Sequence, residues 1–260
     1  AQLEAGPLKY VASCSFGKDS MATILLALMH QEPLDEVVYC EVMFDEGISG
    51  EVPEHRDFIY NRAIPFLERN GVEVVILKSE MTFIKSFYRV LKKGKAEGKL
   101  NSWPLCGRCC IQRDCKLRPI QNYMKSHGNR VTQYVGLAHD EQDRLIRLKA
   151  GKTISLLEKY KKTEQDASEI CKRAGLYSPA YAFSGRNGCF FCPNASDREL
   201  RHLYDFHPDL WRRLLDCQKA SNKATELFNR SERIDEIDLR FRYEDAQFSL
   251  FDNWPHNAAA

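Results

Sequence analysis

The sequence predicts an α/β protein, in which a doubly wound parallel sheet is followed by a mostly helical C-terminal region. Strand-like runs alternate with helical patterns through the first half of the chain, which is typical of parallel sheets built by crossover connections. Two of these runs, 37–39 and 74–77, are almost entirely apolar, as strands buried on both faces are. Residues 9–31 are a β-prone run, a tight turn and a strongly apolar helix. These three observations predict the fold class.

The individual elements follow from the periodicity of apolar residues. We expect strands at 10–14, 37–44, 72–77 and 132–137. Helical patterns lie between them, at 20–31, 53–70, 81–93 and 115–126. Beyond residue 150 the strand signal fades, and helices are predicted from the Thr163 N-cap to near Gly175, at 196–204 and at 208–228. We therefore expect one domain at 1–150 and a helical region at 151–260.

The composition limits the class of protein. With 260 residues and 43% hydrophobic content, the chain is long enough for one large core with an appendage. A net charge of +2 does not by itself demand a nucleic-acid partner. The longest apolar stretch, 21–29, is too short to span a membrane, and no signal-peptide pattern opens the sequence. We expect no membrane partner and a cytoplasmic location.

The turn after the first strand, Ser15-Phe16-Gly17-Lys18-Asp19-Ser20, has the features of an anion site. Amides of a tight turn and of a helix N-terminus point at one place, and serine hydroxyls and a lysine ammonium add donors. The segment resembles the pyrophosphate loop, Ser-Gly-Gly-x-Asp-Ser, of PP-loop ATP pyrophosphatases and phosphoadenosine phosphosulfate (PAPS) reductases, with Phe16 replacing the first glycine. This resemblance implies an adenine nucleotide alpha hydrolase-like fold that binds ATP through residues 15–20. The alternative is an ordinary strand-to-helix turn capped by serine.

Two later segments belong to the same edge of the expected sheet. Asp45 follows the 37–44 strand, where a carboxylate can bind a ribose hydroxyl or a magnesium ion. Glu141 and Arg144 follow the 132–137 strand, and a planar guanidinium suits a phosphate. Both segments resemble elements of the same superfamily, which implies that all three residues bind the nucleotide. The alternatives are an acidic surface turn at Asp45 and a helix-surface ion pair between Glu141 and Arg144.

Ten cysteines in a chain without an export signal indicate metal or redox chemistry rather than disulfides. Some lie in apolar patterns and are interpreted as buried small hydrophobes, namely Cys14, Cys40, Cys171 and Cys217. Others form two clusters with Cys-x-x-Cys spacing, which suits metal binding: Cys106, Cys109, Cys110, Cys189 and Cys192. The adjacent Cys-Cys pair and the later Gly-Cys-x-x-Cys resemble assimilatory adenylylsulfate reductases, which implies a 4Fe–4S cluster. Structural zinc is the alternative, and the choice of four ligands among five cysteines stays open.

The resemblance implies an ATP-dependent, adenylyl-forming enzyme of sulfur metabolism, in particular a sulfurtransferase that adenylates an acceptor and then inserts sulfur. Lys18, Asp19 and Arg144 are the expected catalytic residues, and the expected cofactors are ATP, Mg²⁺ and the 4Fe–4S cluster. The expected partners are an adenine nucleotide, a sulfur donor and a nucleic-acid acceptor, either tRNA or DNA.

Two alternative functions remain open. A sulfonucleotide reductase of this superfamily attacks with a cysteine in a C-terminal Glu-Cys-Gly-Leu/Ile-His motif, which this sequence lacks because its last cysteine is Cys217. A nucleotide-binding module with structural zinc would perform no turnover. For a nucleic-acid acceptor, two basic loops are candidate contacts, one with Lys92, Lys93, Lys95 and Lys99, the other with Lys159, Lys161 and Lys162.

Overall fold

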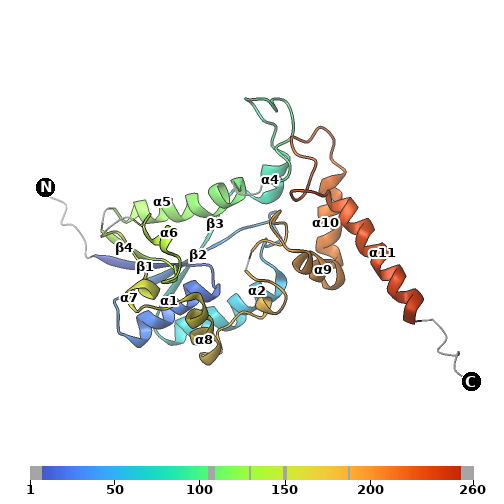
Figure 1. Ribbon diagram of the computed structural model, residues 1–260. Coiled ribbons are helices and arrows are strands. Elements are labelled where there is room, and N and C mark those ends of the chain that lie inside the picture. Colours follow the sequence, from blue (N-terminus) through green and yellow to red (C-terminus); the bar gives the residue numbers. More distant parts are fainter. Residues whose placement is uncertain (1–7, 105–108, 129, 149–150, 187, 253–260) are drawn as a thin grey trace, which may run out of the picture. The chain divides into compact units, whose positions relative to one another are not determined.

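The computed structural model describes residues 8–104, 109–128, 130–148, 151–186 and 188–252 (Figure 1). The chain forms two compact units, each built from segments that are distant in sequence. The first unit contains residues 1–84 and 110–189, and the second contains residues 85–109 and 190–260. Among the described residues, no helix combines the length and apolar character that crossing a membrane requires.

The first unit is built on a parallel sheet in the order β3-β2-β1-β4-β5. Its five strands are β1 (Lys9–Cys14), β2 (Glu36–Glu41), β3 (Glu73–Lys78), β4 (Val131–Tyr134) and β5 (Thr153–Ile154). In register, Val11 of β1 faces Glu36 of β2, while Lys9 faces Val131 of β4. The sheet thus grows outward from β1 in both directions, which confirms the predicted doubly wound fold.

Helices cover both faces of this sheet, as Figure 1 shows. On one face lie α1 (Lys18–Met29), α7 (Leu156–Lys159) and α8 (Glu164–Arg173), which pack together around a core of buried apolar side chains. On the other face lies α5 (Arg118–Ser126). The apolar run from Met21 to Ala27 is buried, which explains why α1 has almost no polar face.

Two predicted helices contain a π-helical segment that ends two residues before a proline. The helix expected at 53–70 consists of α2 (Pro53–Phe58), a π segment η1 (Ile59–Ala63) and α3 (Ile64–Arg69). The helix expected at 115–126 consists of a π segment η2 (Gln112–Leu117) and α5. Pro65 and Pro119 follow these segments, and proline lacks the amide that an α-helical turn would use. The wider turn accommodates the missing hydrogen bond.

Several expectations about secondary structure were wrong. The helix expected at 81–93 is only α4 (Phe83–Phe87), after which the chain becomes extended. The helix expected at 208–228 is α10 (Pro208–Gln218), and it ends where the buried Lys223 ammonium donates to the Gln218 carbonyl at 2.7 Å. Strand β5 and three helices were not predicted, namely α6 (Gln142–Leu145), α7 and α11 (Ile234–Asp252).

Aromatic side chains organise the second unit. Trp103 packs edge-on against Phe87 and Phe228, each with ring centroids 5.0 Å apart, and its indole donates to Gln218 at 2.9 Å. Trp211 of α10 donates to Asp238 of α11 at 2.7 Å. The remaining helix, α9 (Asp197–Phe206), begins with a capping box between Ser196 and Glu199. The predicted helical character of the C-terminal part is confirmed.

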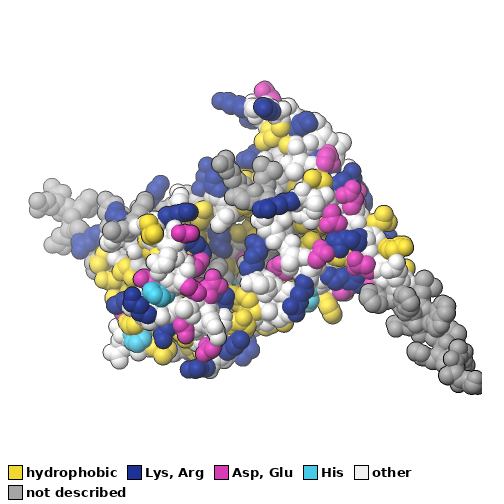
Figure 2. All heavy atoms as spheres, in the orientation of Figure 1, with side chains coloured by type: hydrophobic (Ala, Val, Ile, Leu, Met, Phe, Trp, Pro, Cys, Tyr) yellow, Lys and Arg dark blue, Asp and Glu magenta, His cyan; other side chains and the backbone are white. Residues whose placement is uncertain are grey.

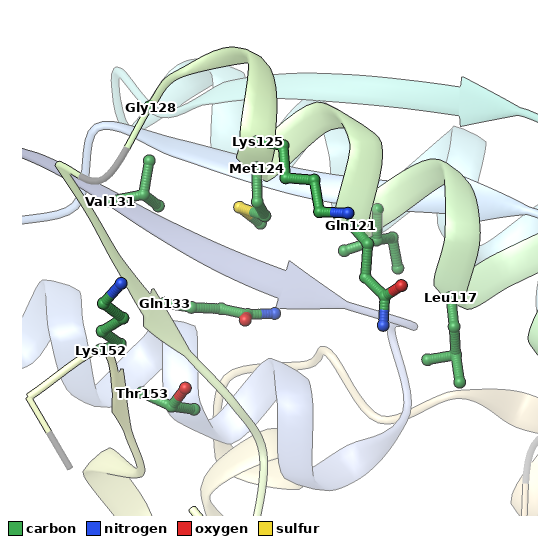
Figure 3. Close-up of a pocket in the computed structure, with 10 residues that line it drawn as sticks. Leu117, Gln121, Met124, Lys125, Gly128, Val131, Gln133, Lys152 and Thr153 are labelled. Carbon is green, nitrogen blue, oxygen red and sulfur yellow. The ribbon is translucent and has the colours of Figure 1, made fainter. Parts of the chain in front are cut away.

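A cavity of about 610 Å³ lies between α5 and strands β4 and β5 of the first unit (Figure 3). Figure 3 shows Leu117, Gln121 and Met124 of the α5 side facing Val131 and Gln133 of β4. Among its described residues, the connection from β4 to β5 contains one short helix, α6. The lining combines four apolar side chains with polar ones, and its charged residues are Lys125 and Lys152.

Candidate functional site

The turn between β1 and α1 presents open amide groups. Helix α1 starts at Lys18 and has no side-chain cap, so its first-turn amides are not satisfied by a capping group. The Lys18 amide donates to the Tyr181 hydroxyl at 2.8 Å. The Ser20 hydroxyl accepts from the Ser15 amide at 3.3 Å and donates to the Gly17 carbonyl at 3.0 Å, which holds the turn closed. The amides of Gly17, Asp19 and Ser20 have no partner among the described residues, and together with the positive end of the helix dipole they form a site for an anion.

Phe16 has a backbone conformation that a glycine, as in the Ser-Gly-Gly-x-Asp-Ser pattern, would adopt without strain. Its φ is +57°, in the left-handed region that disfavours a side chain. The ring is 1% exposed and packs edge-on against Tyr39 with centroids 5.2 Å apart. Burial of the ring offsets the backbone strain. Phe16 therefore shapes the loop from below, and it is not among the residues that line the cavity described next.

A cavity of about 320 Å³ opens above this turn. It lies where the strand order reverses between β1 and β4, beyond their carboxyl ends, which is where ligands bind in doubly wound sheets. Residues from four separate segments line it: Ser15, Gly17, Lys18, Asp19, Ser20, Gly136, Glu141, Arg144, Glu164, Tyr181, Gly185 and Arg186. The predicted loop residues and the Glu141–Arg144 segment thus meet in one cavity.

Gly136 allows the end of β4 to approach the first turn of α1. A Cβ at this position would lie 2.6 Å from the Ser20 nitrogen, 2.7 Å from the Asp19 carbonyl carbon and 2.8 Å from the Ser20 Cα. These are backbone atoms at contacts that real Cβ atoms do not make, so a larger residue would force the two segments apart. The close approach brings Glu141 and Arg144 to the loop.

Opposite charges neutralise one another inside the cavity. Lys18 Nζ lies 2.7 Å from Glu164 and 3.0 Å from Asp19. Burial acts to lower the pKa of Lys18, but the hydrogen bonds to Glu164 and Asp19 outweigh it and raise that pKa. Burial raises the pKa of Asp19 against the opposing effect of Lys18, with a further contribution from the nearby charges of Glu164 and Glu141. Lys18 is therefore a firmly charged cation at the helix N-terminus.

Glu141 and Arg144 form an ion pair, as the alternative interpretation predicted, and both also line the cavity. Glu141 further accepts from the Ala138 amide at 3.0 Å, which fixes the start of α6. Asp45 is placed differently. Its carboxylate accepts from the Gly47 and Ile48 amides at 2.9 and 2.7 Å, which stabilises a turn, and it does not line the cavity. Binding of the nucleotide by Asp45 stays a prediction.

The buried His55 supports the loop from α2. Its Nε2 lies 3.0 Å from the Ser15 carbonyl and its Nδ1 lies 2.9 Å from the Ser178 hydroxyl. Because a carbonyl only accepts, Nε2 must carry the proton and Nδ1 must accept from Ser178. Burial lowers the pKa of His55 and favours this neutral form. The imidazole joins the loop to the segment that carries Tyr181.

Five cavity residues were not among the predicted site residues: Gly136, Glu164, Tyr181, Gly185 and Arg186. Glu164 is the first residue of α8, whose Thr163 N-cap was predicted, but its pairing with Lys18 is a long-range contact. Tyr181 belongs to the short helix η3 (Pro179–Ala182). The segment Ser184-Gly185-Arg186 lies one residue before the Gly188-Cys189 motif, and this neighbouring glycine and arginine were the signal available.

The cysteines fall into two classes of exposure. Burial is confirmed for the four predicted buried thiols, and Cys115 is also buried: Cys14, Cys40, Cys115, Cys171 and Cys217. The described motif cysteines, Cys109, Cys110, Cys189 and Cys192, are partly exposed and form no disulfide. Cys110 and Cys189 belong to the first unit, and Cys109 and Cys192 to the second. Cys106 lies outside the described residues, and convergence of the motif cysteines on one metal stays a prediction.

Replacing Gly136 with alanine is expected to lower affinity for ATP at least tenfold, since the new Cβ displaces the Asp19–Ser20 backbone that closes the cavity. Isothermal titration calorimetry measures this change. The matched control is Gly47→Ala, where a Cβ makes an ordinary 3.8 Å contact with Asp45. Equal ATP affinity in Gly136→Ala and the wild type would contradict the assigned role of this close approach.

His55 is expected to titrate below the pKa of a free histidine, because burial disfavours its charged form, and to carry its proton on Nε2 when neutral. Since the folded pKa is lowered, the unfolded chain binds more protons below about pH 6.5, and stability declines as the pH falls through that value. Nitrogen-15 NMR of labelled histidines measures the protonation state and the tautomer of His55. A neutral His55 with its proton on Nδ1, or a His55 pKa that is not lowered, would refute the hydrogen-bond assignment.

No family model and no curated protein match the sequence. Four chains of solved structures match it. One is the U34-tRNA thiolase NcsA from Methanococcus maripaludis with its 4Fe–4S cluster, at 18% sequence identity and a TM-score of 0.41, over 94% of this chain and 75% of that chain. At this level, the likeness alone assigns neither a fold nor a reaction to the chain.

Proposed function

We propose that this protein is an ATP-splitting, adenylyl-forming enzyme of the PP-loop type that transfers sulfur to an acceptor. The observation that carries the proposal is the cavity at the β1–β4 switch point. It combines the open amides at the start of α1 with the serine hydroxyls of the loop and with three cationic side chains, Lys18, Arg144 and Arg186. Amides and cations aimed at one small space suit the phosphates of a nucleotide.

The proposed reaction is nucleophilic substitution at the α-phosphorus of ATP. An acceptor oxygen forms a bond to this phosphorus, the bond to the bridging oxygen breaks, and pyrophosphate leaves. A sulfur nucleophile then attacks the activated carbon or phosphorus of the acceptor and displaces AMP. The loop amides and Lys18 stabilise the charge that develops on pyrophosphate. Arg144 would hold the α-phosphate, since its guanidinium forms two parallel hydrogen bonds with phosphate oxygens.

The carboxylates of the cavity suit a magnesium ion bound with the phosphates. Asp19, Glu141 and Glu164 all line the space, and Mg²⁺ prefers oxygen ligands from a few carboxylates together with phosphate oxygens. When ATP enters, its phosphates would pair with the cations of the cavity, and the magnesium ion would pair with the carboxylates. These contacts would replace the ion pairs that now lie within the cavity. Asp19 belongs to the loop itself, so we assign it to the ion that neutralises the departing pyrophosphate.

The motif cysteines suit a 4Fe–4S cluster. They are partly exposed while the other described cysteines are buried, as expected of thiols that bind a metal from solution. We propose Cys109, Cys110, Cys189 and Cys192 as ligands, with Cys106 as a substitute, and zinc as the competing metal. The cluster would supply a site for the transferred sulfur.

The sulfonucleotide reductase alternative requires an accessible thiolate at the end of the chain. Cys217 is 2% exposed, and burial raises its pKa to about 12. This thiol cannot act as the attacking nucleophile in the folded protein. The sulfur donor and the acceptor, which we propose to be a nucleic acid, must come from outside the chain.

The double substitution Asp19→Ala with Ser20→Ala is expected to abolish ATP binding measured by calorimetry, because it removes a proposed ligand of magnesium and the hydroxyl that closes the loop. The matched control is Asp57→Ala with Ser126→Ala, which removes an exposed carboxylate and hydroxyl outside the cavity. Unchanged ATP affinity in a folded Asp19/Ser20 variant would overturn the proposed nucleotide site.

Protein purified without oxygen is expected to be brown and to contain about four irons per chain. Cys189→Ser and Cys192→Ser should each lose iron, whereas Cys217→Ser, at a buried site outside the motifs, should retain it. Metal analysis and the visible absorption spectrum measure both effects. A content of one zinc per chain would favour structural zinc over the 4Fe–4S cluster, and metal-free protein would refute both proposals.

A further inference from the structure

A hairpin extends from the second unit directly after α4. We call it the basic arm (residues 88–100), and Figure 1 shows it as the loop that follows α4. Val90 bridges Leu100 across the hairpin, and the Leu91 amide donates to the Lys99 carbonyl at 2.9 Å. At its base, the amides of Leu100 and Ala224 donate to the Asn222 and Leu100 carbonyls at 2.9 and 2.8 Å. The arm is therefore an ordered feature of the fold.

The basic arm carries a dense set of unpaired cations. Its exposed basic side chains are those of Arg89, Lys92, Lys93, Lys95 and Lys99, and Glu97 is its one acidic residue. None of these cations forms an ion pair with any part of the chain that the structure describes. Figure 2 shows dark-blue side chains gathered at the tip of the hairpin. Like charges held this close repel one another, and a polyanion relieves that repulsion.

Many other described cations pair with neighbouring carboxylates. In the second unit, Arg201 pairs with Asp205 at 3.0 Å and Arg240 pairs with Asp197 at 2.9 Å. In the second basic loop considered from the sequence, Lys159 pairs with Glu32. The structure thus distinguishes the two candidate loops, because the basic arm alone of these two keeps all its described lysines free for a ligand.

We propose that the basic arm binds the phosphodiester backbone of a nucleic acid. The proposal rests on the proposed function in one respect, since this nucleic acid would be the acceptor. Tyr88 and Val90 at the base of the arm are 44% and 52% exposed, although both are large apolar side chains. An exposed aromatic ring beside cations suits a base next to its phosphates, which favours a nucleic acid over an acidic polypeptide.

The test uses the full-length protein and two fluorescent probes, a tRNA-sized RNA and a duplex DNA of similar length. Replacing Lys92, Lys93, Lys95 and Lys99 with glutamine is expected to weaken binding at least tenfold and to reduce the slope of log K against log salt by about 3. The corresponding arginine variant should bind as the wild type does. The charge-matched control replaces exposed cations of the first unit with glutamine: Arg69, Lys125, Lys152 and Lys161.

The outcomes separate this inference from the proposed nucleotide site. The probe that binds more strongly, RNA or DNA, identifies the kind of nucleic acid that the arm binds. Either result supports the proposal if the glutamine variant no longer binds that probe. Equal loss in the control variant, or equal affinity of wild type and arm variant, would overturn the proposal. Equally tight binding of polyglutamate would also overturn it. The glutamine variant of the arm should bind ATP with the affinity of the wild type, as measured by calorimetry. A failure of the proposed ATP site would therefore be seen independently of RNA or DNA binding.

Discussion

The close approach of two backbone segments, the end of β4 and the first turn of α1, is the constraint on which the site depends. Only a glycine at 136 permits it, because any Cβ there would overlap the Ser20 backbone. The contact lies at the point where the strand order reverses, so loops from both halves of the sheet meet above it. The cavity and its lining of paired cations and carboxylates follow from this arrangement, and the open amides of α1 face the same space.

The loop shows how a departure from a sequence pattern can preserve a geometry. A glycine would take a positive φ at position 16 without strain, whereas Phe16 takes it because its ring is buried against Tyr39. Beneath the same loop, the neutral His55 ties the Ser15 carbonyl to Ser178. The anion site is therefore held from the core side by packing and by a buried hydrogen-bond network, and not by the flexibility of glycine.

Local pattern was enough to predict the first four strands, α1, the capped start of α8 and the loop of the candidate site. It failed where distant contacts decide the structure. Residues 88–93 looked helical, yet they pair with residues near Leu100. Glu164 and Arg186 are brought to the cavity by contacts between segments that are distant in sequence, which local patterns do not encode. Each compact unit likewise joins segments far apart in the chain. The pairing of Glu141 with Arg144 was correctly foreseen as an alternative, but pairing and lining the cavity proved compatible.

The central claim is that the open amides at the start of α1 bind the triphosphate of ATP. A crystal structure of the protein with magnesium and α,β-methylene-ATP, which resists cleavage at the α-phosphorus, tests it most directly. We expect phosphate oxygens within hydrogen-bonding distance of the Gly17, Asp19 and Ser20 amides, with Arg144 or Arg186 at the triphosphate. A triphosphate bound elsewhere, for example in the larger cavity beside α5, with the loop amides left open, would contradict it.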